Sequence, residues 1–267
     1  MTLKTALGLT LALVGLPFAA AAQDYEAKLV SKGQLTIGTT GSSPPSTMYD
    51  DTAELVGLDI DLSKKLAADL GLEPEFVVLD WASMLAGVQA GRFDMVASSV
   101  SRTPERVASA DFIVSQPYVA NGVGGVVHKD NAAIKGWEDA CHAKTGIVKG
   151  AVQINTVKAK LGEGCLTEVA EYPGWTELLL DLQNKRIDLA VGNYITPAYL
   201  VNATDRPFRM IEETMAVSGN ALVVQKGNPE LAAKIDALLT SYIADGSLTQ
   251  LTEKWLGKGI SLDQIAK

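Results

Sequence analysis

One segment of the chain occurs twice, and this repeat constrains the fold more than any other feature of the sequence. Residues 81–94 and 175–188 carry the same amino acid at five equivalent positions. In each copy, apolar residues recur at helical spacing and lead into a short apolar run typical of a buried strand. Two related helix–strand units predict two similar α/β lobes. The identical pairs are Trp81 and Trp175, Leu85 and Leu179, Gln89 and Gln183, Arg92 and Arg186, and Asp94 and Asp188.

The rest of the chain alternates between strand and helix patterns around these two units. Asp59 or Asp61 is expected to cap the first long helix, and Gly71 to end it. Further strands are expected at 34–39, 75–79, 93–97, 145–149, 167–172, 187–191, 208–211 and 221–225, further helices at 152–161, 174–184, from Pro229 and at 248–256, and a polar loop at 202–205.

The predicted fold is α/β, with two Rossmann-like lobes joined by a two-strand hinge and a ligand cleft between them. The first lobe is expected to comprise residues 23–120 and 221–267, and the second residues 121–220. The chain then crosses between the lobes twice, at the glycine-containing segments 119–124 and 217–220. Two crossings permit the two lobes to close on a ligand like a hinge.

The stretch after the third predicted strand has the composition of an anion site. Three serines, including Ser99 and Ser101, follow the strand, and Thr103 before Pro104 is typical of a helix start. Arg106 then stands near the third helical position, where a cation opposes the helix dipole at a cost of about 0.3 to 1 kcal/mol. Hydroxyls, free amides and a guanidinium together predict a pocket for a carboxylate or a phosphate.

A generic strand-to-helix turn offers another interpretation, in which Arg106 pairs with Glu105, Asp111 or another surface acid and the serines cap the turn. The repeat favours the ligand site. At the repeat offset, Ser99 corresponds to Asn193, and both follow the carboxyl end of a predicted strand, where open α/β sheets bind ligands. If the two lobes face each other, Ser99 and Asn193 lie across one cleft.

The N-terminal segment predicts export. Lys4 precedes an apolar run over residues 6–16, and small residues ending at Ala22 follow it, as in a secretory signal peptide. The apolar run is shorter than the ~20 residues that a membrane-spanning helix needs. We therefore expect residues 1–22 to be cleaved after Ala22 and the mature protein to lie in the periplasm, without inserting into the membrane.

The cysteine count and the net charge limit the kinds of site and the partners that this chain can have. Cys141 and Cys165 are the only cysteines, and an exported chain meets an oxidising compartment, so we expect a disulfide. The alternatives are a reactive thiol or a metal pair with His142, although two cysteines and one histidine make a poor zinc signature. The formal net charge of −8 argues against nucleic acid and anionic membrane surfaces as partners.

Several short motifs in a fixed order identify a family resemblance. They are the strand Leu35-Thr36-Ile37-Gly38-Thr39, Gly57-Leu58-Asp59-Ile60-Asp61-Leu62, the Trp81 helix leading into Arg92-Phe93-Asp94, the run from Ser99 to Arg106, Ser115-Gln116-Pro117-Tyr118 and Lys254-Trp255-Leu256-Gly257. Together they make nearly the whole mature chain resemble the periplasmic solute-binding proteins of bacterial ABC transporters for polar amino acids. The resemblance implies the type II periplasmic binding fold and a monomer without a cofactor. Such a monomer captures an amino acid or a related carboxylate and delivers it to membrane permease subunits.

The resemblance also implies roles for individual residues. Arg106 is expected to hold the α-carboxylate of the ligand with the help of Ser99 and Ser101, and Trp81 to form one wall of the site. Its twin Trp175 is assigned to the core instead. The expected ligand-binding residues are Arg106, Ser99, Ser101, Trp81, Asn193, Thr40, Ser43, Gly150 and Val152.

Some of these positions depart from the family pattern. Thr40 stands where an acid is common, Ser43 where an aromatic lid is common, and Asn193 where an aspartate usually accepts the ligand ammonium. Ala151 and Val152 follow Gly150 in place of Thr or Ser, which leaves backbone amides to bind the anion. Arg and Lys are therefore poor ligand candidates. A neutral or acidic amino acid, one with a secondary amine, and a carboxylate without an amine all remain open.

Two other functions fit the same architecture. The first is a dehydratase-like enzyme that acts on a small carboxylic acid, and it needs an acid or a base facing the cleft. His128 and His142 are the only histidines, and both are expected at the surface of the second lobe. The second is a sensor domain that presents its ligand to a receptor.

Overall fold

The computed structural model describes residues 25–203, 205–211, 214–215 and 218–257. The predicted signal peptide, the end of the first lobe beyond residue 257 and residue 217 of the second crossing lie outside these ranges. Within them, no helix combines the length and the apolar character that a membrane crossing requires.

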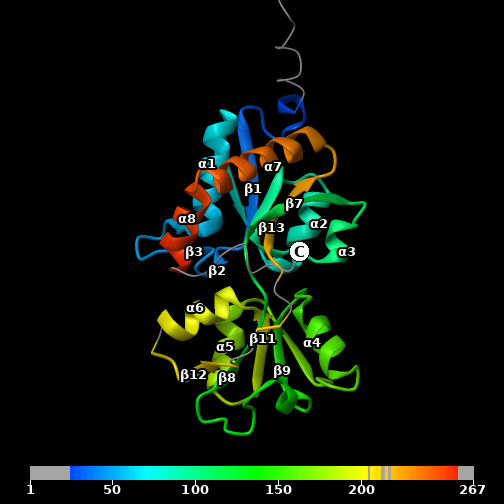
Figure 1. Ribbon diagram of the computed structural model, residues 1–267, viewed down its shortest axis with the longest axis vertical. Helices are drawn as coiled ribbons and strands as arrows, with labels where there is room; N and C mark the ends of the chain where they lie inside the picture. The colour runs from blue at the N-terminus through cyan, green and yellow to red at the C-terminus, as the bar shows by residue number, and fades with distance from the viewer. Residues whose placement is uncertain (1–24, 204, 212–213, 216–217, 258–267) are drawn as a thin grey trace, which may run out of the picture.

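Two five-stranded sheets with the same topology form the molecule (Figure 1). In each sheet four strands run in one direction, and the fourth strand in spatial order runs antiparallel to both of its neighbours. The first sheet has the order β5 (Glu73–Val78), β1 (Gln34–Thr39), β6 (Met95–Ser101), β13 (Asn220–Gln225) and β7 (Phe112–Val119). The second has the order β10 (Val169–Tyr172), β9 (Thr145–Val148), β11 (Leu189–Asn193), β8 (Val123–His128) and β12 (Phe208–Met210).

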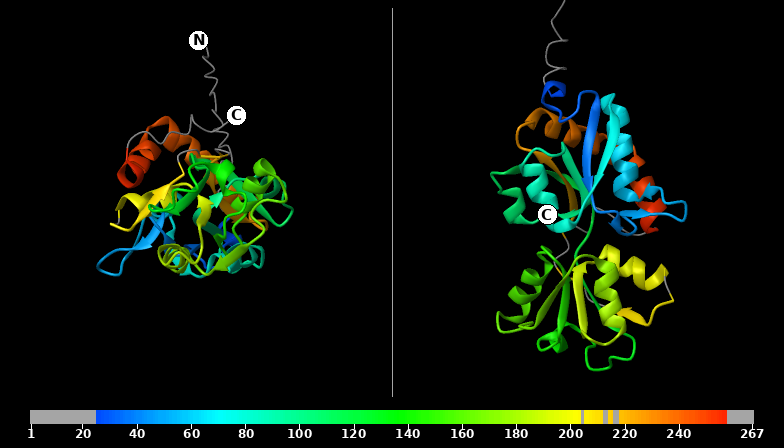
Figure 2. Two further views of the ribbon diagram at one scale, coloured as in Figure 1. Left: turned by 90° about the horizontal axis from the view of Figure 1, so that it is seen from below. Right: turned by 180° about the vertical axis from the view of Figure 1, so that it is seen from behind.

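Helices cover both faces of each sheet, as the view from behind also shows (Figure 2). In the first sheet, α1 (Leu58–Leu70), α7 (Pro229–Ala244) and α8 (Ser247–Leu256) pack on one face, and α2 (Met84–Gln89) on the other. In the second, α4 (Gln153–Leu161) packs on one face, and α5 (Trp175–Gln183) and α6 (Ile195–Ala203) on the other. The remaining elements are short: α3 (Pro104–Val107), the strands β2 (Ser42–Ser43), β3 (Thr47–Tyr49) and β4 (Leu55–Val56), and 3-10 turns at Glu26–Lys28, Trp81–Ser83 and Trp137–Ala140. This architecture confirms the predicted α/β class.

The structure explains the last matched pair of the repeat. Asp94 precedes β6, and its carboxylate accepts a hydrogen bond of 2.9 Å from the backbone N–H of Thr36 on β1. Asp188 precedes β11, and its carboxylate accepts one of 3.0 Å from the N–H of Lys144, just before β9. Each aspartate therefore ties the start of one central strand to the neighbouring parallel strand. The repeat thus encodes the same strand pairing in both sheets.

Two adjacent segments connect the sheets (Figure 1). Residues 120–122 lead from β7 to β8, and the segment that ends at Gly219 leads back to β13. The two segments are hydrogen-bonded to each other, because the Ser218 N–H donates to the Asn121 carbonyl at 2.7 Å and Met215 pairs with Val123. The connection is therefore a short two-stranded ribbon.

Three local predictions need correction. Asp59 and Asp61 do not cap α1, because Gly57 occupies the cap position with φ 135° and both aspartates lie within the first turn of the helix. The third strand runs over Met95–Ser101 rather than 93–97, so the serines belong to its end. The expected polar loop at 202–205 begins inside α6, a helix that the local sequence pattern did not predict.

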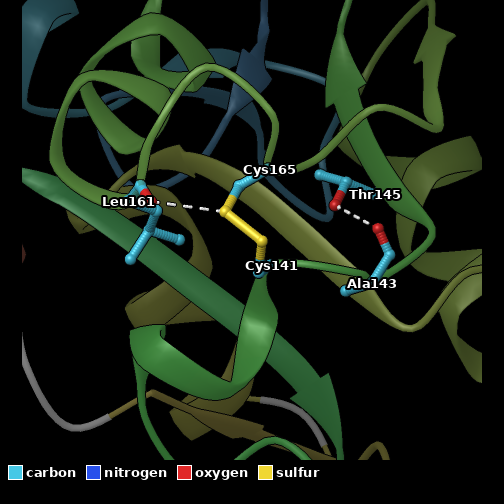
Figure 3. Close-up of a disulfide and its surroundings, with 5 residues drawn as sticks. All are labelled: Cys141, Ala143, Thr145, Leu161 and Cys165. Carbon is cyan, nitrogen blue, oxygen red and sulfur yellow. Dashed lines mark hydrogen bonds between the residues drawn. A yellow bond between two sulfur atoms is a disulfide. The ribbon is translucent and has the colours of Figure 1, made fainter.

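The predicted disulfide is confirmed. Cys141 and Cys165 are joined in the second lobe, with their Cα atoms 4.4 Å apart (Figure 3). Cys165 is buried and packs in the cluster of Ile154 and Val157 from α4. Because the two sulfur atoms are bonded to each other, neither the reactive thiol nor the metal pair with His142 applies.

Candidate functional site

A cavity of about 50 Å³ lies between the two sheets. It is formed at the carboxyl ends of β1 and β6 from one lobe and of β9 and β11 from the other, which is the usual ligand position in open α/β sheets. Seven of the nine expected ligand-binding residues line it: Thr40, Ser43, Trp81, Ser99, Ser101, Arg106 and Asn193. Ser98, the third serine of the predicted anion pocket, and Ala151, which follows Gly150, also line it. The other lining residues are Ser42, Val148, Gln153, Pro173, Gly174, Trp175, Val191 and Gly192.

Arg106 is the only residue with a charged side chain among the described residues that line this cavity. It occupies the third position of α3, where its N–H donates to the Thr103 hydroxyl at 3.3 Å, as the Thr-Pro pattern predicts. Arg106 is 7% exposed, and its guanidinium donates to the Ser101 carbonyl at 2.8 Å and lies 5.5 Å from the centre of the Trp81 ring.

No carboxylate of the described residues forms an ion pair with Arg106. The alternative interpretation, in which Arg106 pairs with Glu105 or Asp111, is therefore wrong. Burial lowers the pKa of the Arg106 guanidinium, and the charge of nearby Glu105 offsets part of this effect. A buried cation without an acidic partner is energetically costly. The site is therefore suited to an anion that arrives from outside the protein.

Serine hydroxyls surround this cation. Ser99 is 5% exposed, and its Oγ is a buried atom without a hydrogen-bond partner among the described residues. Ser101 Oγ accepts a hydrogen bond of 2.9 Å from the Gln153 side chain. Ser98 Oγ donates to Thr40 Oγ1 at 3.1 Å and so joins the ends of β6 and β1. Ser99 thus lines the same cavity as Arg106 and carries a hydroxyl without a protein partner among the described residues.

The second lobe contributes amides and aromatic surface. Asn193 ends β11, and its Oδ1 accepts the N–H of Thr196 at 3.3 Å in the first turn of α6. Trp175 packs in the core, as expected, and also lines the cavity. A Cβ atom at Gly192 would lie 2.4 Å from the Trp175 ring, so this position requires glycine.

Gly150 and Val152, the other two expected residues, lie outside the lining of this cavity. The Gly150 carbonyl accepts a hydrogen bond of 3.3 Å from the Trp81 indole N–H. Val152 lines a second, larger cavity of about 580 Å³ that shares Ser101, Arg106 and Gln153 with the first. Ser101, Arg106 and Gln153 therefore lie where the two cavities adjoin.

Two hydrogen bonds join the lobes across the cleft. The Trp81 indole of the first lobe donates to the Gly150 carbonyl of the second, and the Gln153 amide of the second donates to Ser101 of the first. The lobes are thus in contact around the cavity. Gln153 was missed because its role depends on a residue 52 positions away, and the one available signal was its place at the start of α4, after the Gly150 turn.

The histidines lie away from this site. His128 ends β8 and is buried, so its expected surface position is wrong; its Nδ1 accepts the N–H of Asp130 at 3.2 Å. Neither His128 nor His142 lines the cavity. Across the described ranges, no group of His, Cys, Asp and Glu is arranged to hold a metal ion.

Comparison with known proteins places this geometry in a family. Residues 35–258 match the bacterial extracellular solute-binding proteins, family 3. The L-cystine-binding protein TcyA of Bacillus subtilis is 30% identical over 243 residues, which cover 89% of this chain and 87% of TcyA.

Solved structures of amino-acid-binding proteins have the same fold as this chain. An ancestral arginine-binding protein bound to arginine is 31% identical with a TM-score of 0.77, and the match covers 84% of this chain and 99% of that chain. The ancestral amino acid-binding protein AncCDT-1, a precursor of cyclohexadienyl dehydratase, is 28% identical with a TM-score of 0.75, over 84% of this chain and 96% of that chain. The family match, the shared two-sheet fold and the cavity at the strand ends agree: this chain belongs to family 3 of the bacterial extracellular solute-binding proteins.

Proposed function

We propose that the chain is the periplasmic amino-acid-binding component of an ABC importer, which captures its ligand by closure of two lobes. The single observation that carries this proposal is the buried Arg106 guanidinium, the one charged side chain of the described cavity lining. An α-carboxylate supplies the missing negative charge in a shape that a guanidinium can bind with two parallel hydrogen bonds. The Ser99 hydroxyl adds a third donor.

The domain and site assignments are part of this proposal. Residues 23–120 and 221–267 form the first lobe, and residues 121–220 the second. Trp81 forms a wall of the site, and Thr40, Ser43 and Asn193 face the body and the amino end of the ligand. Gly150 and Val152 lie where the second lobe approaches the first and contribute backbone groups when a ligand is bound.

The ligand is a neutral or acidic amino acid, or a related carboxylate. The described cavity lining contains no carboxylate that could pair with the cationic side chain of arginine or lysine. The cavity of about 50 Å³ has room for only a few water molecules, since each needs roughly 10 to 15 Å³ of such volume, so it suits a small ligand. A longer ligand such as L-cystine, which the name of TcyA specifies for that protein, requires access to the second cavity.

The protein is a binding protein rather than an enzyme. Its relatives are binding proteins by name, and no carboxylate or imidazole of the described residues lines the cavity to act as an acid or a base. Delivery completes the proposed cycle: the signal peptide is removed after Ala22, the monomer collects its ligand in the periplasm, and the closed form docks on permease subunits.

Two measurements test the proposal. Mass spectrometry of the small molecules released by mild denaturation of the purified protein should detect an amino acid or a related carboxylate. A thermal-shift panel of the standard amino acids and L-cystine should then give a saturable rise in melting temperature with that compound. If no member of the panel, nor any copurified carboxylate, raises the melting temperature, the proposed function is wrong.

Asn193→Asp is expected to improve binding of ordinary α-amino acids by roughly fivefold. A carboxylate at this position accepts from a ligand ammonium with a charge-assisted hydrogen bond, which is worth about 1 kcal/mol more than a bond to a neutral amide. Isothermal titration calorimetry measures the change. Asn155→Asp is the matched control, because Asn155 lines only the larger cavity. An unchanged affinity in Asn193→Asp would show that the missing charge does not explain selectivity.

Gln153→Ala is expected to shift the preference of the site toward longer ligands. The substitution removes the bond to Ser101 and joins the two cavities. One neutral hydrogen bond is worth about 1 kcal/mol, so binding of a small amino acid such as L-alanine should weaken roughly fivefold. The ratio of L-cystine to L-alanine affinity should rise, whereas it should not change in the control Gln183→Ala, because Gln183 is exposed and lines neither cavity.

A further inference from the structure

A buried carboxylate lies behind the cavity, and the proposed ligand contacts do not use it. Asp59 is in the first turn of α1 and has 0% exposure. One carboxylate oxygen accepts a hydrogen bond of 2.7 Å from the Ser99 N–H, and the other accepts one of 2.6 Å from the Tyr118 hydroxyl. Asp59 therefore connects the end of β6 to the end of β7.

Ser99 needs this partner because its backbone leaves the regular strand. Its φ is 51°, a left-handed conformation that is uncommon for a residue with a side chain. The pairing of β6 with β13 shifts here, since Val96 pairs with Val223 but Val100 pairs with Ala221. Asp59 accepts the Ser99 N–H within this irregular stretch. The same turn carries the unpartnered Ser99 Oγ that lines the cavity.

Tyr118, the second partner of Asp59, lies next to the hinge. It lies one residue before the end of β7, and the chain crosses to the second lobe directly after it. Asn220, on the returning segment, pairs with Val119, the residue that directly follows Tyr118. The Asn121 amide donates to Asn220 Oδ1 at 3.0 Å and so links the two crossing segments.

Asn121 also reaches the second half of the site. Its Oδ1 accepts the N–H of Tyr194 at 3.1 Å and the N–H of Ile195 at 3.2 Å. These residues directly follow Asn193, the repeat partner of Ser99. A series of buried polar groups thus extends from the Ser99 turn, through the hinge, to the Asn193 turn.

We propose that Asp59 is a positioning residue of the ligand site, which holds the Ser99 turn in its binding conformation and connects it, through Tyr118 and the Asn121–Asn220 pair, to the hinge. This inference rests on the proposed function, because it assigns Asp59 a role in that same site. Asp59 itself touches no ligand.

Titration of Asp59 gives the proposal a measurable signature. Burial raises the pKa of Asp59 to about 6, against the opposing effect of its bonds from Tyr118 and Ser99. Protonation places an O–H on one carboxyl oxygen, which can be satisfied only if the Tyr118 hydroxyl turns to accept it, and it removes the charge that strengthens the bond from the Ser99 N–H. Ligand affinity should therefore fall as the pH is lowered through about 6.

The pH dependence of stability has the opposite sign. Because the pKa of Asp59 is higher in the folded state than in the unfolded state, the folded protein binds the proton more tightly, and stability from this group falls as the pH rises from about 4 to 6. Tyr118 is the one titratable group on α1, β6 or β7 that acts on Asp59 within the described residues. Asp61, on the same helix, instead accepts from Lys254 and Trp255.

The test compares Asp59→Asn with the wild-type chain at pH 5.0 and pH 7.5. The probe is L-cystine, or the panel member with the largest thermal shift if L-cystine gives none. Wild-type affinity should weaken roughly tenfold at pH 5.0, as expected one pH unit below the pKa. Asp59→Asn should bind roughly tenfold more weakly than wild type at pH 7.5, with the same affinity at both pH values. Its melting temperature without ligand at pH 7.5 should equal or exceed that of the wild type.

Two further variants separate positioning from a structural role. Tyr118→Phe removes one bond that stabilises the Asp59 carboxylate and should move the midpoint of the wild-type pH profile to higher pH. Asp61→Asn is the matched control and should keep the wild-type profile. A pH-independent wild-type affinity, or an Asp59→Asn variant that retains wild-type binding, would overturn the inference while the proposed function stands. A wild-type chain that binds neither a member of the panel nor a copurified carboxylate would overturn both.

Discussion

Arg106→Ala is expected to abolish the ligand-dependent rise in melting temperature. The guanidinium is the one charged side chain of the described cavity lining, and no described carboxylate pairs with it. Loss of a buried charge-assisted pair with the ligand carboxylate should cost about 3 kcal/mol, which corresponds to roughly a hundredfold weaker binding. Calorimetry and thermal shift with the same amino acid measure the loss.

Two variants make this result specific. Arg102→Ala removes the same charge four residues away, from a side chain that donates to the Ser115 carbonyl and lines only the larger cavity. It should bind as the wild type does. Arg106→Lys keeps the charge but loses the planar fork and should lie between the wild type and Arg106→Ala. Undiminished binding in Arg106→Ala would place the anion site elsewhere.

Removal of the disulfide is expected to cause a large loss of stability in the folded protein. Replacing both Cys141 and Cys165 by Ala opens a loop between residues 24 positions apart. The chain-entropy model gives a loss of about 3 kcal/mol in the free energy of unfolding for a loop of this length. For a chain of this size, such a loss lowers the melting temperature by roughly 6 to 12 °C. Urea unfolding monitored by Trp fluorescence provides the measurement.

Ligand affinity should be the same in the double Cys→Ala variant as in the wild type, because neither cysteine lines the cavity. A reducing agent provides the matched comparison: it should destabilise the wild-type chain to the level of the double variant and leave the variant itself unaffected. Equal unfolding curves for oxidised and reduced wild-type protein would contradict the prediction.

Features that depend on neighbouring residues could be predicted from the sequence. The repeat predicted two related lobes, because Asp94 and Asp188 each tie a central strand to the strand beside it. The Thr103-Pro104 pair predicted the start of α3 and hence the third helical position of Arg106, because a helix cap is a contact between residues three apart. The two cysteines predicted their disulfide because no other cysteine competes.

Helix α6 shows why some elements could not be predicted from the sequence. Its sequence contains Pro197 and has no clear polar face, so local patterns do not favour a helix. Its first amide is satisfied from a distance, since Asn121 accepts the N–H of Ile195 from 74 residues away, whereas Asn193 accepts the next one, from Thr196, locally. The start of the helix therefore depends on the hinge as well as on its own sequence.

The sequence by itself determined the two-lobed α/β architecture, the disulfide and the cation at a helix start, because each follows from residues close in the chain or from a repeat within it. The tertiary structure alone decided which groups complete the site. Asp59 satisfies the local rule for a helix cap, yet it accepts from Ser99 and Tyr118, 40 and 59 residues away. Inside the protein a buried carboxylate is held by the donors that folding brings to it, and their sequence distance has no influence on that choice.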